Sequence, residues 1–237
     1  MARLFFILVC VCLMNCEDKQ SRKKTNTTVS DSIVVSQKIE PTKSKDPLPE
    51  TPERRYPLLT EKNAMEFFLQ YDALHKENKV RLVTDYGNID ILLFNKTKFH
   101  RANFIYLTKQ GYFNDTQFYR VIENYIVQGG STDDKDVMQK RKVIGKYLLP
   151  TDTKRGFKHD RGVISMPSSE IDNPHKLASP YEFFITLRDV YQLDGDYTIF
   201  GKVISGLDVA DKIANVDTDD GDWPLQNVYI RRVEILE

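Results

Sequence analysis

Apolar residues recur at every second position through most of the chain from residue 79 onward. The clearest case is the pair of runs 79–84 and 89–93, which flank the turn-forming sequence Asp-Tyr-Gly-Asn at 85–88. Alternation on both sides of such a turn predicts a β-hairpin. Similar short runs predict further strands at 118–122, 125–128, 143–149, 162–166, 183–186, 198–203 and 228–236.

Three other segments carry apolar residues at helical spacing. The first follows Thr60, a suitable N-cap before Glu61. Its apolar face contains Ala64, Phe67, Phe68, Tyr71 and Leu74. The second runs from Phe99 to Gln110, before a C-capping Gly111, and the third covers 207–214. We expect the first helix to dock on the domain that follows, with a partner-binding helix as the alternative. Many short strands with two internal helices predict a mainly-β fold, a closed barrel capped by helices.

The start of the chain has the features of an export signal. A short basic region ends at Arg3, and a continuous apolar run follows from Leu4 to Leu13. This run is too short to span a bilayer as a permanent helix. The next residues, Leu-Met-Asn-Cys, resemble the cleavage site of bacterial lipoproteins, whose cysteine is acylated and becomes the first mature residue. We therefore expect a lipoprotein signal peptide at 1–15 and lipidation of Cys16; a plain signal peptide is the alternative.

The composition changes after Cys16. Residues 17–57 are rich in Lys, Ser, Thr, Asp and Pro and contain almost no aromatic side chains. Such a segment cannot bury enough apolar area to offset its ordering entropy, which predicts a disordered tether. The expected organisation is the acylated cysteine and tether at 16–58, a helical extension at 59–78 and the main domain at 79–237. The basic run Arg22–Lys24 could contact lipid head groups, but a solvated linker is the preferred interpretation.

Charge and residue counts exclude several classes of function. The 237 residues include 34 basic and 34 acidic side chains, so no excess of positive charge draws the chain to nucleic acid. All cysteines lie at or before Cys16, and no two of the four histidines have metal-ligand spacing. We therefore expect neither a metal nor another cofactor. The acidic run 217–222 lacks the distal Glu of an EF-hand and predicts a surface loop.

The stretch TQFYRVIENYIVQGG from Thr116 to Gly130 sets Arg120 and Gln128 in otherwise apolar strands. Arg and Gln rarely enter such surroundings without paired hydrogen bonds, so both are expected to line a shared concave face. The stretch resembles the cyclophilin signature FHRVIxxFxxQGG. The resemblance continues in order through GVISM, EFFIT and LDGDYTIFGKVISGLDVADKI, and it extends from about Lys79 to the C-terminus.

This resemblance implies a closed eight-stranded antiparallel β-barrel with peptidyl-prolyl cis/trans isomerase activity. Arg120 matches the catalytic arginine of the family, and Gln128 matches the residue that hydrogen-bonds the carbonyl side of the substrate. The matched substrate-binding positions are Tyr125, Ile126, Phe184, Leu193, Tyr197 and Glu182. Glu182 replaces the usual Gln and is a candidate partner for Arg120. The loop 167–181 is longer than in the family and carries Pro167, Ser168 and Ser169 in place of residues that contact the substrate backbone.

Together these features predict a monomeric isomerase that acts on X-Pro bonds of exported polypeptides. We expect a lipid anchor in the cell envelope, at the outer membrane and facing the periplasm, with surface display as the alternative. An outer-membrane protein or secretion component is a candidate partner. Two other functions remain open at this point, a cyclophilin-fold binding module with little catalysis and a general holdase. Retention of both Arg120 and Gln128 favours the enzyme.

Overall fold

The computed structural model describes residues 55–168 and 173–237. The expected signal peptide, Cys16 and the tether up to residue 54 lie outside these residues, as do Ser169 and the three residues after it. Within the described part, no helix has both the length and the apolar character needed to cross a membrane.

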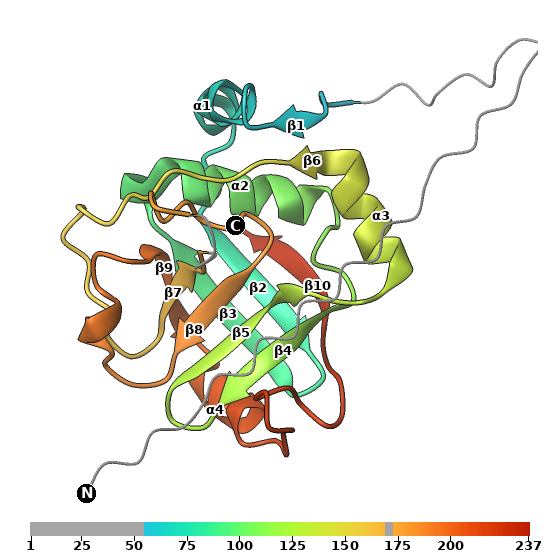
Figure 1. Cartoon of the computed structure of the whole chain (residues 1–237), viewed down its shortest axis with the longest axis vertical. Coiled ribbons are helices and arrows are strands. Elements are labelled where there is room, and N and C mark those ends of the chain that lie inside the picture. The colour runs from blue at the N-terminus through green and yellow to red at the C-terminus, as the bar shows by residue number, and fades with distance from the viewer. Residues whose placement is uncertain (1–54, 169–172) are drawn as a thin grey trace, which may run out of the picture. The chain divides into compact units, whose positions relative to one another are not determined.

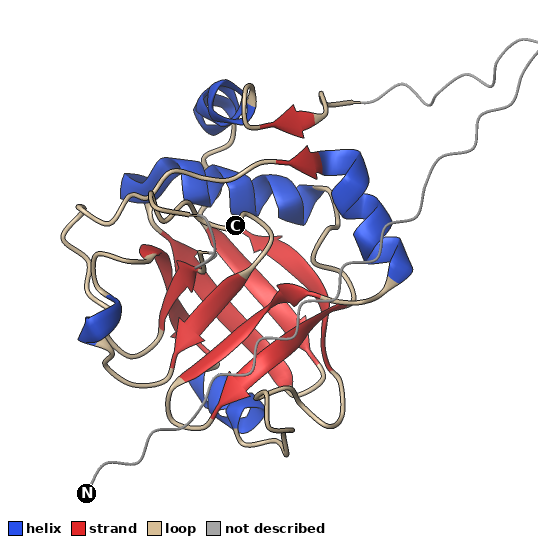
Figure 2. Ribbon diagram, in the orientation of Figure 1, coloured by secondary structure: helices blue, strands red, loops and turns tan. Residues whose placement is uncertain are grey.

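Eight strands close into an antiparallel barrel in the order β10-β2-β3-β9-β7-β8-β5-β4 (Figures 1 and 2). Pairing of β10 with both β2 and β4 completes the closure. The expected mainly-β, closed eight-stranded fold is confirmed. The strands are β2 (Lys79–Thr84), β3 (Gly87–Leu93), β4 (Thr116–Ile122), β5 (Ile126–Ser131), β7 (Val163–Met166), β8 (Phe183–Thr186), β9 (Thr198–Ser205) and β10 (Val228–Leu236).

Helices cover the two ends of the barrel. Helix α2 (Lys98–Lys109) lies across one end and α4 (Leu207–Ala214) lies at the opposite end (Figure 1). From α2, Phe104 enters the core, where its ring lies 4.6 Å from that of Phe113 and 5.7 Å from that of Phe183. Burial of these aromatic side chains supplies much of the driving force that holds α2 on the sheet. Two 3-10 turns, η1 (Asn95–Thr97) and η2 (Tyr191–Leu193), lie in the connections.

The N-terminal extension begins with a strand. Residues Leu59–Thr60 form β1, which pairs in parallel with β6 (Gly145–Lys146), and helix α1 (Ala64–Leu74) starts four residues after Thr60. The prediction that Thr60 caps this helix is therefore wrong. The Asn63 Oδ1 atom instead accepts hydrogen bonds from the Thr60 backbone N–H (2.7 Å) and hydroxyl (3.1 Å), which holds Thr60 before the helix.

The predicted docking of α1 on the main domain is confirmed. Phe68 is fully buried, and the rings of Phe67 and Tyr71 lie 5.1 Å and 5.3 Å from that of Tyr106 on α2. Tyr56 also packs on Tyr106, with 5.3 Å between ring centroids. Packing thus reaches back to Tyr56, which the sequence had placed in the tether, because its ring completes this aromatic cluster.

The strand predicted at 143–149 is wrong. The structure has helix α3 (Lys135–Ile144) here, followed by only the two residues of β6. The Asp134 carboxylate caps the helix by accepting hydrogen bonds from the backbone N–H groups of Asp136 (2.8 Å) and Val137 (3.1 Å). The described residues therefore contain four α-helices, one more than the two capping helices and the N-terminal helix that were expected.

Candidate active site

Arg120, Gln128 and Phe184 form a row across three neighbouring strands. Arg120 on β4 pairs in register with Gln128 on β5, which in turn pairs with Phe184 on β8. Side chains at paired positions lie on the same face of a sheet, with Cβ atoms about 5 Å apart. The adjacent residues Val127 and Phe183 point into the core, so the row lies on the outer face of the barrel.

A hollow of about 270 Å³ opens beside this row. Its lining brings together residues from three strands and three connections: Arg120, Tyr125, Ile126, Gln128, Pro167, Ser168, Phe184, Leu193 and Tyr197. All the predicted catalytic and substrate-binding residues except Glu182 thus lie around one cavity. Its apolar wall is rigid, because Ile126 and Phe184 are almost fully buried and the Phe184 ring meets that of Tyr197 edge to face at 5.5 Å.

The ion-pair partner of Arg120 is Asp222, not Glu182 as the sequence suggested. The Nε and Nη2 atoms of Arg120 each lie 3.2 Å from Oδ2 of Asp222. Glu182 is instead tied to Tyr119, whose hydroxyl donates to its Oε2 atom at 3.0 Å. The carboxylate facing Arg120 therefore comes from the acidic loop 217–222, which the sequence analysis had treated only as surface.

The loop that presents Asp222 is fixed by its own hydrogen bonds. Asp219 Oδ1 accepts from the backbone N–H groups of Gly221 and Trp223, both at 2.9 Å. The Asp222 carbonyl accepts from the Val121 N–H at 2.9 Å, which ties the loop to β4. Asp222 itself has φ of 63°, a conformation that costs energy for a residue other than Gly. The loop conformation therefore holds a carboxylate next to Arg120.

A second hydrogen-bond chain orients Gln128. Its Nε2 group donates to the Tyr119 hydroxyl, which in turn donates to Glu182. Burial raises the pKa of Tyr119, as does the nearby charge of Glu182, so the hydroxyl keeps its proton and remains a donor. Glu182 thus acts through Tyr119 and fixes which way the Gln128 amide faces.

Comparison with known proteins agrees with this geometry. The profile of the family described as cyclophilin type peptidyl-prolyl cis-trans isomerase/CLD matches residues 79–235. This chain belongs to the cyclophilin family. The predicted class of enzyme is confirmed at the level of the family. The curated relatives described next are named as peptidyl-prolyl cis-trans isomerases.

The cyclophilin relatives include fungal, bacterial and protozoan proteins. "Peptidyl-prolyl cis-trans isomerase-like 2" of Rhizopus delemar is 37% identical over 70% of this chain, which spans only 30% of that relative's length. "Peptidyl-prolyl cis-trans isomerase" of Acinetobacter baylyi is 36% identical over 59% of this chain and 73% of its own length. A crystal structure of a Cryptosporidium parvum cyclophilin type isomerase is 29% identical, with a TM-score of 0.58, and covers 68% of this chain and 98% of its own.

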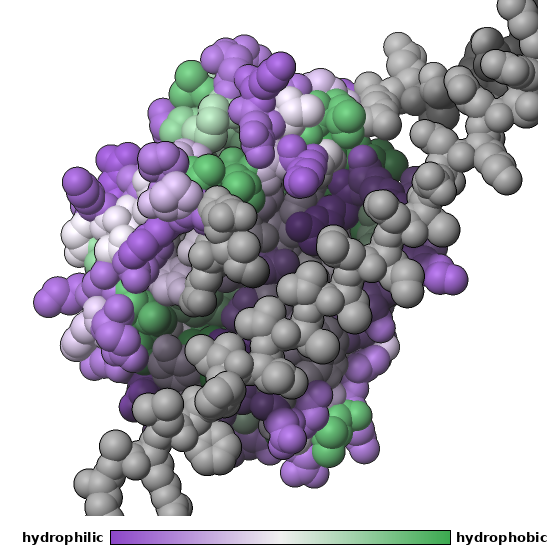
Figure 3. Space-filling view, in the orientation of Figure 1, coloured by the Kyte–Doolittle hydropathy of each residue, from purple (hydrophilic) through white to green (hydrophobic). Residues whose placement is uncertain are grey.

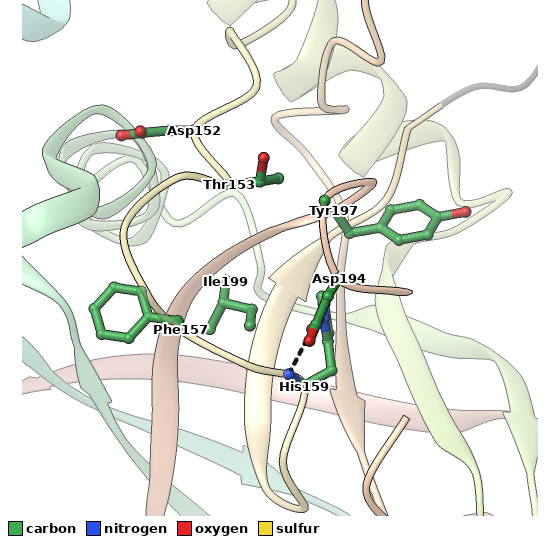
Figure 4. A pocket seen from close by; sticks show the side chains of 8 residues that line it. Asp152, Thr153, Phe157, His159, Asp194, Tyr197 and Ile199 are labelled. Carbon is green, nitrogen blue, oxygen red and sulfur yellow. Dashed lines mark hydrogen bonds and ion pairs between the residues drawn. The ribbon is translucent and has the colours of Figure 1, made fainter. Parts of the chain in front are cut away.

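Behind the apolar wall of this cyclophilin site lies a buried histidine, His159 (Figure 4). Its ring is nearly parallel to that of Phe184, at 6.1 Å between centroids. The Nδ1 atom lies 2.7 Å from the Asp194 carboxylate and the Nε2 atom 3.0 Å from the Ser165 hydroxyl. Because Asp194 follows Leu193, this contact fixes the segment that brings Leu193 to the hollow. In Figure 4, Asp194 points at His159 and the Tyr197 ring turns away from the pair.

The surroundings of His159 favour the neutral ring and one of its tautomers. Burial lowers its pKa, although the hydrogen bond with Asp194 acts in the opposite direction. A carboxylate only accepts hydrogen bonds, so Nδ1 carries the proton and Nε2 accepts from Ser165. No group of three or more His, Cys, Asp or Glu side chains in the described part of the chain is arranged to hold a metal ion.

Sequence analysis missed Tyr119, Asp222 and His159 as parts of the site. Tyr119 precedes Arg120 within the quoted signature, so its position was a signal that it lies nearby. Asp222 is 102 residues from Arg120, and the acidic run around it gave no sign of where the loop would fold. His159 was considered only as a metal ligand, and an isolated histidine in a loop carries no other signal.

Proposed function

We propose that this chain catalyses cis/trans isomerisation of X-Pro bonds in exported polypeptides by stabilising the twisted amide with Arg120. The observation that carries the proposal is the position of the Arg120 guanidinium at the edge of an apolar hollow, in register with Gln128 and Phe184. Binding of an apolar proline ring alone requires the hollow, whereas a charged donor beside the ring is needed only to stabilise the twisted amide.

The chemistry requires no covalent step. Rotation about an X-Pro bond has a barrier of ~18–20 kcal/mol because the resonance of the amide must be broken. The catalyst must therefore bind the twisted amide more tightly than either planar form. In the twisted state the proline nitrogen loses conjugation and gains a lone pair, so a fixed donor directed at that nitrogen lowers the energy of the twisted state only.

Arg120 is suited to this role because it is always charged and carries several donors in one plane. Asp222 engages the Nε and Nη2 edge of the guanidinium. The donors on Nη1 then remain for the substrate. A donor held in place before the reaction needs no reorganisation as the lone pair develops, which is the main source of electrostatic catalysis.

The other residues position the substrate. The hollow of 270 Å³ is lined by Ile126, Phe184 and Leu193 on its apolar side and is suited to a proline ring. Gln128, oriented by Tyr119, is placed to hydrogen-bond the carbonyl of the residue before proline. With both ends of the dipeptide unit held, rotation is confined to the bond between them.

A protease-coupled assay on a proline-containing peptide, performed with the full chain, tests this function. We expect measurable acceleration, and loss of about a hundredfold in kcat/KM for Arg120→Ala, the magnitude typical of removing one preorganised donor. Arg232→Ala is the matched control, because Arg232 pairs with Glu234 on the exposed surface of β10. Absence of turnover in the wild-type chain would favour the binding module instead.

The exported context is part of the proposal and rests on residues 1–16. The apolar run before Cys16 and the lipoprotein-like sequence around it support lipid attachment in the cell envelope. The location that we propose for the anchor is the outer membrane, with the domain facing the periplasm. Growth of the native host with labelled palmitate tests it. We expect label in the wild-type protein and none in Cys16→Ser, with the variant released from the membrane fraction. Protease treatment of intact cells then separates periplasmic from surface display.

A further inference from the structure

A second and larger concavity lies away from the active site, between the N-terminal extension and α3. Figure 1 shows β1, β6 and α3 next to one another at the end of the barrel covered by α2. The concavity between them measures about 620 Å³ and is called here the β1–α3 groove. Its lining includes Leu58, Met138, Arg141, Lys142, Lys146 and Leu148.

The floor of the β1–α3 groove is apolar and exposed to solvent. Leu58, Met138 and Leu148 are 44%, 49% and 37% exposed, respectively. In Figure 3, green apolar surface beside β1 borders purple polar surface toward α3. Exposed apolar side chains gathered in one concavity are typical of a binding site, whereas single exposed ones are ordinary.

Buried hydrogen bonds fix the shape of this floor. The Tyr181 hydroxyl donates to the Gly145 carbonyl at 2.7 Å. The Tyr147 hydroxyl donates to Asn103 Oδ1 at 2.7 Å, and Asn103 Nδ2 donates to the Pro180 carbonyl at 2.8 Å. The groove is therefore formed before any partner arrives, so binding does not have to order its floor.

The rim of the groove is basic. The charged residues that line it are Arg141, Lys142, Lys146 and Glu61, three basic and one acidic, a net charge of +2 in a chain whose total is zero. None of Arg141, Lys142 and Lys146 takes part in an ion pair with any other residue that the structure describes. The Arg141 guanidinium lies over the Tyr181 ring at 4.6 Å, which holds its charge at the groove edge.

We propose that the β1–α3 groove binds an extended acidic segment of a partner protein, in which apolar side chains alternate with carboxylates. The apolar side chains would contact Leu58, Met138 and Leu148, and the carboxylates would pair with the basic rim. A concave surface favours a peptide over a lipid bilayer, which requires a convex or flat contact. This function is separate from isomerisation, because the groove shares no residue with the lining of the active-site hollow.

Fluorescence anisotropy with the full chain tests this proposal. The probe is a labelled, proline-free peptide of alternating Leu and Glu, which the isomerase site has no reason to select, and the control peptide has Lys in place of Glu. We expect the Glu peptide alone to bind, with an affinity that falls as the salt concentration rises.

Variants of the groove test which residues carry this binding. Lys142→Glu combined with Lys146→Glu should weaken binding by about tenfold or more, and Met138→Asp should also weaken it. Lys212→Glu, on α4 at the other end of the barrel, and Arg120→Ala should leave the affinity unchanged.

Several results would overturn the proposal. Equal binding of both peptides, or insensitivity to the groove variants, would show that the basic rim selects nothing. No binding of the Glu peptide to the wild-type chain would also contradict it. If binding appears only after Asp46, Glu50 and Glu53 are replaced by Ser, the chain's own tether is the occupant. If phosphatidylglycerol vesicles bind in a groove-dependent way and the peptide does not, the surface contacts lipid.

Discussion

At the scale of single residues, the orientation of Arg120 depends on Asp222. An arginine side chain has about 2 kcal/mol of rotamer entropy, and this one is partly exposed at the edge of the hollow. The ion pair with Asp222 limits that freedom before substrate arrives. The hydrogen bonds of Asp219 and Val121 hold the loop in turn, so the guanidinium is positioned by a fixed element of backbone.

Asp222→Asn should therefore lower kcat/KM by roughly tenfold, equivalent to about 1.4 kcal/mol of transition-state stabilisation. Its thermal stability should change little, because an ion pair between two partly exposed side chains contributes at most about 1 kcal/mol. The peptide isomerisation assay and a thermal melt measure the two quantities. Asp220→Asn, a neighbour in the same loop with an exposed side chain, is the matched control. Equal kinetics in the wild type and both variants would show that Asp222 does not position Arg120.

The sequence could predict the residues of the hollow better than the contacts between them. Alternation along 116–130 places Arg120 and Gln128 on one face, and the cyclophilin signature points to the residues around them. The partner of Arg120 was predicted wrongly, because both Glu182 and Asp222 are acidic and only the folded loop decides which carboxylate is near. Contacts across more than a hundred residues of chain are not encoded in local periodicity.

At the scale of elements, α1 is joined to α2 by aromatic packing and by a buried ion pair. Asp72 on α1 accepts hydrogen bonds from Arg101 on α2 and from Lys76, the latter at 2.9 Å. Burial alone would raise the pKa of Asp72, but the hydrogen bonds from Lys76 and Arg101 outweigh it and hold the pKa below its usual value. The Arg101 side chain is only 3% exposed, so water cannot solvate its charge and Asp72 compensates it.

Asp72→Ala should reduce the free energy of unfolding by about 3 kcal/mol, because it leaves the Arg101 charge buried without its partner. Urea unfolding measures this change. Asp208→Ala removes an exposed carboxylate that pairs with Lys212 on the same helix, and should change the free energy of unfolding far less than Asp72→Ala, because solvent screens this pair. If the two variants lose the same amount, the α1–α2 ion pair has no special role in stability.

Helix α3 shows where element prediction from sequence failed. The apolar residues Val143, Tyr147 and Leu149 lie at even spacings, a pattern that predicts a strand, but a helix ends within this run and β6 has only two residues. The capping residue Asp134 was present in the sequence, but five basic residues in 135–148 obscured the apolar face of the helix. The barrel strands were predicted well because their alternation reflects burial on one side only, whereas α3 buries little of its surface.

At the scale of the whole molecule, a buried histidine sets a limit on acid stability. His100 on α2 is fully buried, and neither ring nitrogen has a hydrogen-bond partner among the described residues. Its ring lies 6.3 Å from that of Phe200 in the core. Burial lowers the pKa of His100 from 6.5 to about 4, with a small opposing effect of Asp152.

Stability should therefore fall as the pH drops from 7 to 5. In this range the unfolded chain takes up a proton on His100 and the folded chain does not, which favours unfolding by about 2 kcal/mol at pH 5. Chemical denaturation at both pH values measures the difference. His100→Phe should remove this part of the pH dependence, leaving that of His159, whose pKa burial also lowers. An unchanged slope in the variant would show that His100 does not limit stability.

The central claim is that Arg120 stabilises the twisted amide more than it stabilises bound substrate. Exchange NMR on a proline-containing peptide measures both the isomerisation rate on the protein and the Kd. Our account predicts that Arg120→Ala lowers the rate about a hundredfold while Kd changes by less than about threefold, because binding depends mainly on the apolar hollow. A rate that stays unchanged, or that falls only in proportion to lost binding, would contradict it.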